Sequence, residues 1–143
     1  MQSKYNFDIS VNVQNSDIES NNSISYDIRL KSNGRIVGNI DIRPVMSNYL
    51  YYLGQIGYNI YPEFRGNNYA YKACLLLFEL AQKEYDLSEL YITCSPDNAP
   101  SYKILSKLKG ELLEIAEVPK EHELYCRNEK TKCIFHYDLN ILR

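Results

Sequence analysis

Residues 58–70 read YNIYPEFRGNNYA and connect an extended segment to a helical one. The extended segment ends at Pro62, which has no N–H to donate to a strand ladder, and an apolar helical pattern begins near Asn68. A loop at the N-terminus of a helix presents unpaired backbone N–H groups and the positive end of the helix dipole. Arg65 adds a positive charge to this loop. The stretch is therefore typical of a phosphate site, and a diphosphate is the expected ligand.

Length and composition place the chain among ordinary globular proteins. Its 143 residues suit one domain with one core, which we expect over residues 1–143. With 45% apolar and 24% charged residues, the composition does not indicate a disordered chain. The formal net charge of -2 argues against nucleic acid as a partner, because a surface that binds nucleic acid is basic.

Neither a membrane segment nor a signal peptide is expected. No apolar run approaches the roughly 20 residues that span a bilayer, and residues 1–8 are polar. We therefore expect a cytoplasmic protein without a membrane partner. The four cysteines have spacings unlike metal-ligand pairs, so we expect no metal and interpret them as reduced, non-catalytic thiols: Cys74, Cys94, Cys126 and Cys133.

The first part of the chain predicts strands. Polar and apolar residues alternate over 5–13, 25–30 and 36–42, which is the pattern of half-buried strands. The last two flank the sequence KSNGR at 31–35, where Asn-Gly favours a tight turn, so they should form a hairpin. The span 14–23 is polar and lacks a helical stripe, which indicates a loop.

The rest of the chain predicts four more strands and two main helices. The expected strands are 51–61, 90–94, 111–118 and 132–139, the expected helices are 69–84 and 101–108, and 119–131 is a polar loop. The strand, helix, strand unit at the centre favours a right-handed parallel connection. We therefore predict an α+β (mixed α/β) fold with a mixed, mostly antiparallel sheet of about seven strands and a central splayed parallel pair.

Two loops should meet at one edge of this sheet. Residues 63–68 and 95–101 each follow the carboxyl end of a central strand, and ligands bind at that edge of such sheets. If Pro62 and the glycines before it force the two strands apart, an extended ligand can pair with free backbone groups in the gap.

These loops and the helices after them resemble the GNAT superfamily of acetyl-CoA-dependent N-acetyltransferases. The sequence IGYNIYPEFRGNNYA at 56–70 is similar to the pyrophosphate loop Q/R-x-x-G-x-G/A, with Arg65 at the first position and Asn68 at the middle glycine. The sequence NAPSYKILSKL at 98–108 is similar to the N-x-x-S motif of the branch that acetylates N-terminal amines of ribosomal proteins. The resemblance covers roughly residues 24–118.

The resemblance implies a GNAT-like fold, acetyl-CoA as cosubstrate and a set of residues that bind it. A backbone N–H near Ile60 or Tyr61 would meet the negative charge that develops on the thioester oxygen. The alternative role for Arg65 is a surface ion pair with Glu63. The alternative role for Asn98 is that of a helix cap alone. The residues implied for cofactor binding are Ile60, Tyr61, Arg65, Gly66, Asn67, Asn68, Tyr69, Ala70, Asn98 and Ser101.

The sequence departs from the family pattern within both of these motifs. Asn68 replaces a glycine, but Asn is among the few residues that tolerate a positive φ. Leu105 stands where many members have the tyrosine that protonates the departing thiolate, so that role is excluded here. Ser101 matches the serine that serves in the resembled branch, and Tyr102 and Tyr69 are nearby alternatives.

The general base is left open by the sequence. A primary amine with a pKa near 10 is about one part in a thousand neutral at pH 7, so it must be deprotonated before it attacks. Gln55 stands where relatives often have a carboxylate, and His122 is a candidate that we expect to be exposed in its loop. Three carboxylates on predicted strands remain as candidates for the base: Asp41, Glu114 and Glu117. The alternative for each is an ordinary surface carboxylate that is solvated or paired. The predicted catalytic residues are Ser101, Tyr102 and Glu117.

We therefore expect an N-acetyltransferase that moves an acetyl group to a primary amine by direct transfer. The acceptor is a small molecule or a peptide N-terminus, and the alternative function is a non-catalytic CoA-binding sensor or assembly module with the same fold. The helices that the family has between its first two strands are absent, so the acceptor site should be shallow or completed by another subunit. The last strand, 132–139, could pair across a homodimer.

Overall fold

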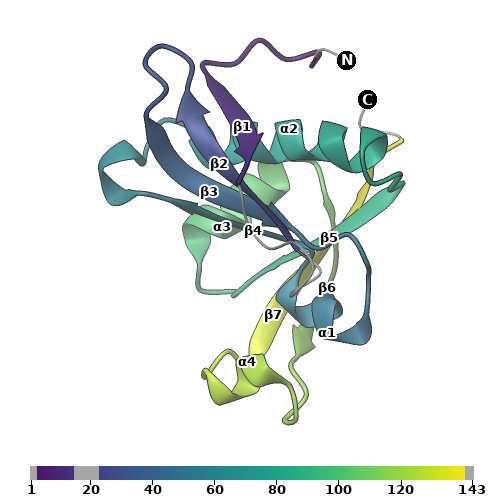
Figure 1. Ribbon diagram of the computed structural model, residues 1–143. Coiled ribbons are helices and arrows are strands. Elements are labelled where there is room, and N and C mark those ends of the chain that lie inside the picture. The colour runs from purple at the N-terminus through teal and green to yellow at the C-terminus, as the bar shows by residue number, and fades with distance from the viewer. Residues whose placement is uncertain (1–2, 15–22, 141–143) are drawn as a thin grey trace. The chain divides into compact units, whose positions relative to one another are not determined.

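The computed structural model describes residues 3–14 and 23–140, and it contains the predicted seven strands and two main helices (Figure 1). Most of the polar span 14–23 lies outside the described residues. In chain order the elements are β1 (Ile9–Val13), β2 (Ile24–Leu30), β3 (Ile36–Ile42), α1 (Asn48–Leu53), β4 (Ile56–Ile60), the 3-10 helix η1 (Pro62–Phe64), α2 (Tyr69–Lys83), β5 (Glu89–Cys94), α3 (Ala99–Lys107), β6 (Glu111–Glu117), α4 (Glu123–Cys126) and β7 (Thr131–Asp138).

The chain divides into two compact units, which are described separately. The first unit comprises Met1–Pro44 and Ile56–Leu87, and the second comprises Val45–Gln55 and Ser88–Arg143. Each unit has its own antiparallel sheet, in the order β1-β2-β3-β4 in the first and β5-β7-β6 in the second. The fold is therefore a mixed α+β fold with mostly antiparallel strands, as predicted, while the single domain over 1–143 stays a prediction.

The first unit is built on the predicted hairpin. Strands β2 and β3 pair antiparallel from Ile24 opposite Ile42, and Gly34 in the connecting turn has a φ of 72°, which favours glycine. Helix α2 lies along one face of this sheet and contacts β1, β3 and β4 (Figure 1). The core of this unit combines the buried stripe of α2 with buried isoleucines of the strands, such as Ile28 and Ile40, as the two apolar patterns predict.

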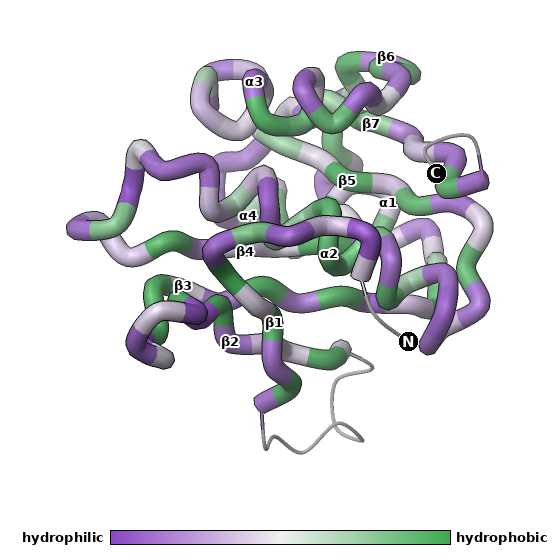
Figure 2. The backbone as a smooth tube through the Cα atoms, turned by 90° about the horizontal axis from the view of Figure 1, so that it is seen from above, coloured by the Kyte–Doolittle hydropathy of each residue, from purple (hydrophilic) through white to green (hydrophobic). Residues whose placement is uncertain are grey.

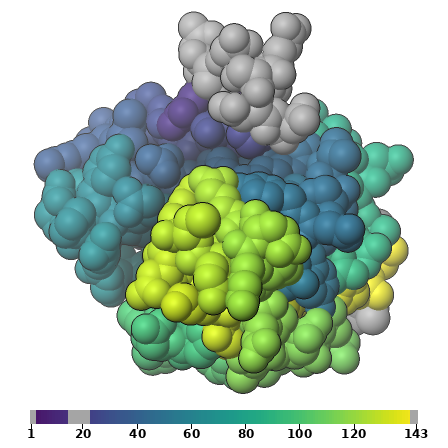
Figure 3. Space-filling model, turned by 90° about the horizontal axis from the view of Figure 1, so that it is seen from below, coloured from purple at the N-terminus to yellow at the C-terminus, as the bar shows by residue number. Residues whose placement is uncertain are grey.

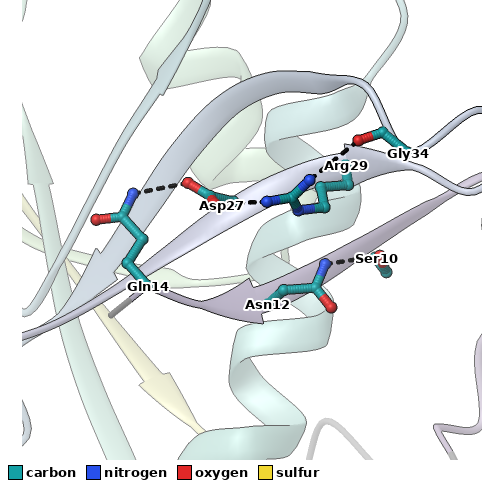
Figure 4. Close-up of polar contacts among 6 residues, drawn as sticks. All are labelled: Ser10, Asn12, Gln14, Asp27, Arg29 and Gly34. Atoms are coloured by element: carbon teal, nitrogen blue, oxygen red, sulfur yellow. Dashed lines mark hydrogen bonds and ion pairs between the residues drawn. The ribbon is translucent and has the colours of Figure 1, made fainter. Parts of the chain in front are cut away.

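The opposite face of this sheet is polar. Figure 4 shows hydrogen bonds that run along β1 and β2 on this face. The Asp27 carboxylate accepts a hydrogen bond from Gln14 Nε2 at 2.8 Å and one from Arg29 at 3.2 Å, and Arg29 also donates to the Gly34 carbonyl. The residues of β3 and β4 on the same face, Asn39, Asp41 and Asn59, are also polar. Their exposure varies: Asn59 is exposed, whereas Asn39 and Asp41 are half-buried.

The second unit packs short helices on a three-stranded sheet. Strand β5 buries every second residue, Leu90, Ile92 and Cys94, and its hydropathy colours alternate in Figure 2. Helix α3 contacts β5, and the buried Tyr137 hydroxyl of β7 donates to the Leu105 carbonyl at 2.7 Å. Because β7 lies between β5 and β6, both of its edges are paired. The expected pairing of 132–139 across a homodimer is therefore wrong, and a dimer would need another surface.

The predicted strand 51–61 is wrong over its first part, which belongs to helix α1. The Ser47 hydroxyl caps this helix by accepting the N–H of Leu50 at 3.2 Å. The helix ends at Gly54, whose φ is 92° and whose N–H donates to the Leu50 carbonyl at 2.7 Å. Strand β4 then starts only at Ile56, so a cap and a positive-φ glycine override the strand preference of the tyrosines.

The predicted parallel pair consists of β4 and β5, which the structure assigns to different sheets. Gln55, the residue before β4, belongs to the second unit, where it pairs with Tyr91 of β5. Its backbone N–H donates to the Tyr91 carbonyl at 2.8 Å, and its side-chain Oε1 accepts the Tyr91 N–H at 2.9 Å. Gln55 is only 2% exposed, and its two hydrogen bonds to Tyr91 give it a structural role.

Candidate functional site

The loop between β4 and α2 has two residues with positive φ. Gly66 has a φ of 90°, and Asn68, the residue before α2, has a φ of 62° and a ψ of 22°. No atom lies within 4 Å of a Cβ built on Gly66, so its backbone angle alone requires glycine. Asn68 takes the left-handed conformation, which its short polar side chain tolerates. The sequence predicted that Asn68 could adopt a positive φ, and in the structure it does.

The loop turns a row of backbone donors outward. No described residue accepts a hydrogen bond from the backbone N–H groups of five consecutive residues: Gly66, Asn67, Asn68, Tyr69 and Ala70. Successive N–H groups around a left-handed residue form a concave anion site, and the first turn of α2 adds its positive dipole end. The first acceptor inside the helix is the Asn68 carbonyl, which receives the Lys72 N–H at 3.0 Å. The loop can therefore hold phosphate oxygens with its backbone.

Arg65 is anchored within the loop. Its Nε donates to the Ile60 carbonyl at 2.9 Å, which ties the guanidinium to the end of β4. No ion pair between Arg65 and Glu63 occurs among the described residues, so the alternative role as a surface pair is not supported. The Asn67 side chain donates to the Phe64 carbonyl at 2.9 Å and closes the preceding turn. Both bonds fix the loop in the shape that presents its donors.

Only one of the two predicted oxyanion donors has an N–H that points away from β3. The N–H of Tyr61 donates to the Val37 carbonyl at 2.9 Å, so this residue cannot serve. In an antiparallel ladder the hydrogen bonds alternate, and Ile60 lies opposite Gly38 in the next, non-hydrogen-bonded pair. The Ile60 N–H therefore points away from β3. Of the two, Ile60 is therefore the candidate whose N–H is not engaged with β3, and its role as oxyanion donor stays a prediction.

The second part of the predicted site lies in the second unit, at the start of α3. The Asn98 side chain caps this helix by accepting the Ser101 N–H at 3.2 Å, so the capping role is present. Ser101 lies in the first turn and is half-buried. Tyr102 is 38% exposed, and its ring packs edge-on against Phe135 with centroids 5.4 Å apart. Ligand contact by Asn98, Ser101 and Tyr102 stays a prediction.

The three candidate carboxylates have different surroundings. Glu117 is exposed at the end of β6, and no hydrogen bond between described residues joins it to Ser101 or Tyr102. Glu114 accepts the hydroxyl of Tyr51, and this hydrogen bond raises the pKa of Tyr51 to about 12. Glu114 is thus engaged as a surface partner, whereas the third candidate is half-buried.

That third candidate, Asp41, lies on the polar face of the first unit. It forms an ion pair with Arg43 at 3.0 Å, and both side chains are 25% exposed. Its neighbours across the strands are Ser25 and Gly57, neither of which is charged. A Cβ built on Gly57 would lie 3.0 Å from Asp41 Oδ1, so the glycine leaves room for the carboxylate. Burial raises the pKa of Asp41, and the positive charge of Arg43 offsets part of this effect.

His122 is buried, which corrects the expectation of an exposed loop histidine. It is 7% exposed, and its Nδ1 accepts the N–H of Leu124 at 3.0 Å as the cap of α4. Its Nε2 lies 2.9 Å from the Tyr49 carbonyl, so this nitrogen carries the proton and donates it. The Tyr49 and His122 rings stack at 4.5 Å. Figure 3 shows the yellow-green segment around α4 against the blue segment around α1.

Replacing His122 by alanine should lower the free energy of unfolding by about 2 to 3 kcal/mol, because the Leu124 N–H and the Tyr49 carbonyl lose their partners. Urea unfolding measures this loss. His136→Ala is the matched control, since His136 pairs with the exposed Glu89 and should change stability by less than about 1 kcal/mol. Equal losses in the two variants would contradict the structural role of His122.

Two further observations concern the described residues. None of the helices within 3–14 and 23–140 has the length and apolar character that crossing a membrane requires. Within the same residues, no group of three or more His, Cys, Asp or Glu side chains is placed to hold a metal ion.

Comparison with known proteins identifies the family. Residues 4–111 match the family model described as an acetyltransferase (GNAT) domain. An uncharacterized N-acetyltransferase, YnaD, from Bacillus subtilis (strain 168) is 26% identical over 90 residues, which are 63% of this chain and 51% of that protein. This chain thus spans about half the length of that curated relative.

Solved structures share the fold. A GNAT-family acetyltransferase from Bacillus anthracis is 21% identical with a TM-score of 0.65, over 81% of this chain and 66% of that one. A putative ribosomal-protein-serine acetyltransferase from Vibrio cholerae is 20% identical with a TM-score of 0.62, over 81% and 64%. These identities establish the fold, while the family match covers more than half of the sequence. The chain therefore belongs to the acetyltransferase (GNAT) family.

Proposed function

We propose that this protein binds acetyl-CoA and transfers its acetyl group to a primary amine. The observation that carries the proposal is the loop from Arg65 to Ala70, in which an anchored arginine, two positive-φ residues and a helix N-terminus surround backbone donors. In a member of the GNAT family, the pyrophosphate of acetyl-CoA is the anion that suits this loop. The acceptor is a small molecule or a peptide N-terminus.

The proposed reaction is a direct transfer. The neutral amine attacks the thioester carbon, a C–N bond forms, and the C–S bond breaks to release the CoA thiolate. The Ile60 N–H is proposed to stabilise the oxyanion, and Ser101 to protonate the thiolate directly or through water. Asp41 is proposed as the base, because it is half-buried on the polar face, whereas Glu117 is exposed and Glu114 already binds Tyr51.

Ser101→Ala should bind acetyl-CoA as tightly as the wild type and release free thiol at least about tenfold more slowly. Thermal shift with millimolar acetyl-CoA measures binding, and a thiol reagent measures release across a panel of primary amines. Ser106→Ala is the matched control, since Ser106 is an exposed residue of the same helix. Equal rates for the two variants would contradict the proposed role of Ser101.

The same assay separates the two candidate functions. A wild-type protein that shows no thermal shift with acetyl-CoA would overturn cofactor binding, and with it both functions. Binding without thiol release from any amine would favour the sensor or assembly module. The observation that supports this alternative is Leu105, a fully buried residue at the position where the resembled family often has a tyrosine that protonates the thiolate.

A further inference from the structure

Two cysteines that lie far apart in the sequence face each other across two strands of the second unit. Cys94 is the last residue of β5, and its partner in the register of β7 is Cys133. Both are free and buried, with exposed fractions of 4% and 1%. This pairing depends on long-range strand register, which the cysteine spacing does not reveal.

The register gives a backbone separation suitable for a disulfide. The Leu139 N–H donates to the Ser88 carbonyl at 3.0 Å, which makes this pair hydrogen-bonded. Hydrogen bonds alternate along the ladder, so Cys94 and Cys133 also form a hydrogen-bonded pair, with Cα atoms about 5.5 Å apart. Disulfides usually join Cα atoms about 4.4 to 6.8 Å apart. A modest movement of the side chains can therefore join the two sulfur atoms.

We propose that Cys94 and Cys133 form an oxidation site, at which a hydroperoxide converts the two thiols into a disulfide. The two S–H bonds are lost and one S–S bond forms, so the protein gives up two electrons and two protons. With hydrogen peroxide as the oxidant, the O–O bond breaks and two water molecules form.

The surroundings of the pair set the rate of this reaction. The thiolate is the reacting form, and burial raises the pKa of the Cys94 thiol to about 11. The groups that face it are the Cys133 thiol, which raises the pKa, and the Lys132 ammonium, which lowers it. Lys132 is itself paired with Glu129 at 3.1 Å. Oxidation should therefore be slow at neutral pH and accelerate about tenfold per pH unit up to the pKa of Cys94.

The disulfide would restrain the segment that enters the candidate site. Cys94 immediately precedes the turn in which the Asn98 N–H donates to the Ser95 carbonyl at 3.0 Å. A bond to β7 closes a loop of about 40 residues, which should raise Tm by roughly 5 to 15 °C. In a hydrogen-bonded strand pair the two side chains start farther apart than they are in a relaxed disulfide. The bond should therefore be strained and easily reduced.

The test uses the full chain with Cys126→Ser, which removes the exposed thiol. Treatment with hydrogen peroxide should lower the intact mass by about 2 Da, link the Cys94 and Cys133 peptides, and raise Tm until dithiothreitol reverses the change. Adding Cys94→Ser or Cys133→Ser should abolish all three effects. Adding Cys74→Ser should preserve them, because Cys74 is buried in α2 of the first unit.

Two results would overturn the site. One is a gain of oxygen atoms on either cysteine without loss of 2 Da, which would mean that the sulfur atoms cannot meet. The other is an unchanged mass under conditions that oxidise the same chain in urea, which would mean that the native fold prevents the reaction. Neither readout depends on acetyltransferase activity, so the site can fail while the proposed function holds.

Discussion

Replacing Asn68 by valine should weaken acetyl-CoA binding by about 10- to 100-fold. Asn68 has a φ of 62°, a conformation that costs an ordinary L-residue about 1 to 2 kcal/mol and a β-branched residue more. Valine would push the backbone out of this conformation and rotate the N–H groups of the loop away from the phosphate oxygens. Titration calorimetry with acetyl-CoA measures the change in Kd.

Asn68→Gly is the matched control, because glycine adopts the same φ without strain and is the residue at this position in the family motif. It should bind acetyl-CoA within a factor of about three of the wild type. The Asn68 side chain makes no capping hydrogen bond to α2, so its removal should cost the helix little. If the valine variant bound acetyl-CoA normally, the left-handed residue would have no part in the binding site.

The sequence predicted those parts of the fold that depend on local patterns. The hairpin of β2 and β3 appears at 24–30 and 36–42 because alternation and the Asn-Gly turn lie within one short segment. Helix α2 ends within one residue of its predicted boundary, since its apolar stripe spans four turns. The shape of the loop between β4 and α2 was also predictable, because the proline, the asparagine that tolerates positive φ and the start of the helix are adjacent in the sequence.

Helix α1 was missed because its local signals conflict. It has only six residues, three of which are tyrosines with a strand preference, so no helical period is visible. The signals that identify it are the cap at Ser47 and the stop at Gly54, which lie on either side of the tyrosines. A short helix of this kind forms through its caps and its contacts with β5 and β7, and only the caps can be read from the sequence.

The burial of His122 and Gln55 could not be predicted, because their partners are distant in the sequence. His122 contacts a carbonyl 73 residues away, and Gln55 pairs with a backbone group 36 residues away. A polar side chain is interpreted as exposed unless its partner is known, since burial without a hydrogen bond is costly. The central place of β7 has the same origin, because strand order depends on long-range pairing.

Replacing Asp41 by asparagine should lower kcat/KM for the amine by about 100-fold or more, while acetyl-CoA binding stays unchanged. Burial raises the pKa of Asp41, which makes its carboxylate a stronger proton acceptor than an ordinary surface carboxylate. The wild-type rate should therefore rise with pH as Asp41 loses its proton. In the variant this step should disappear, and the rate should follow only the fraction of neutral amine.

The stability of this variant separates catalysis from structure. A raised native pKa means that the folded protein binds the proton more tightly than the unfolded chain, so this contribution to stability is present at low pH and is lost as pH rises through the native pKa. Asparagine, which stays neutral, should therefore leave stability at pH 7 within about 1 kcal/mol of the wild type. Asp27→Asn is the matched control, since Asp27 lies on the same polar face and pairs with Arg29 at 3.2 Å. An equal loss of rate in both variants, or an unchanged pH profile in Asp41→Asn, would show that the base is another residue and would return Glu117 to consideration.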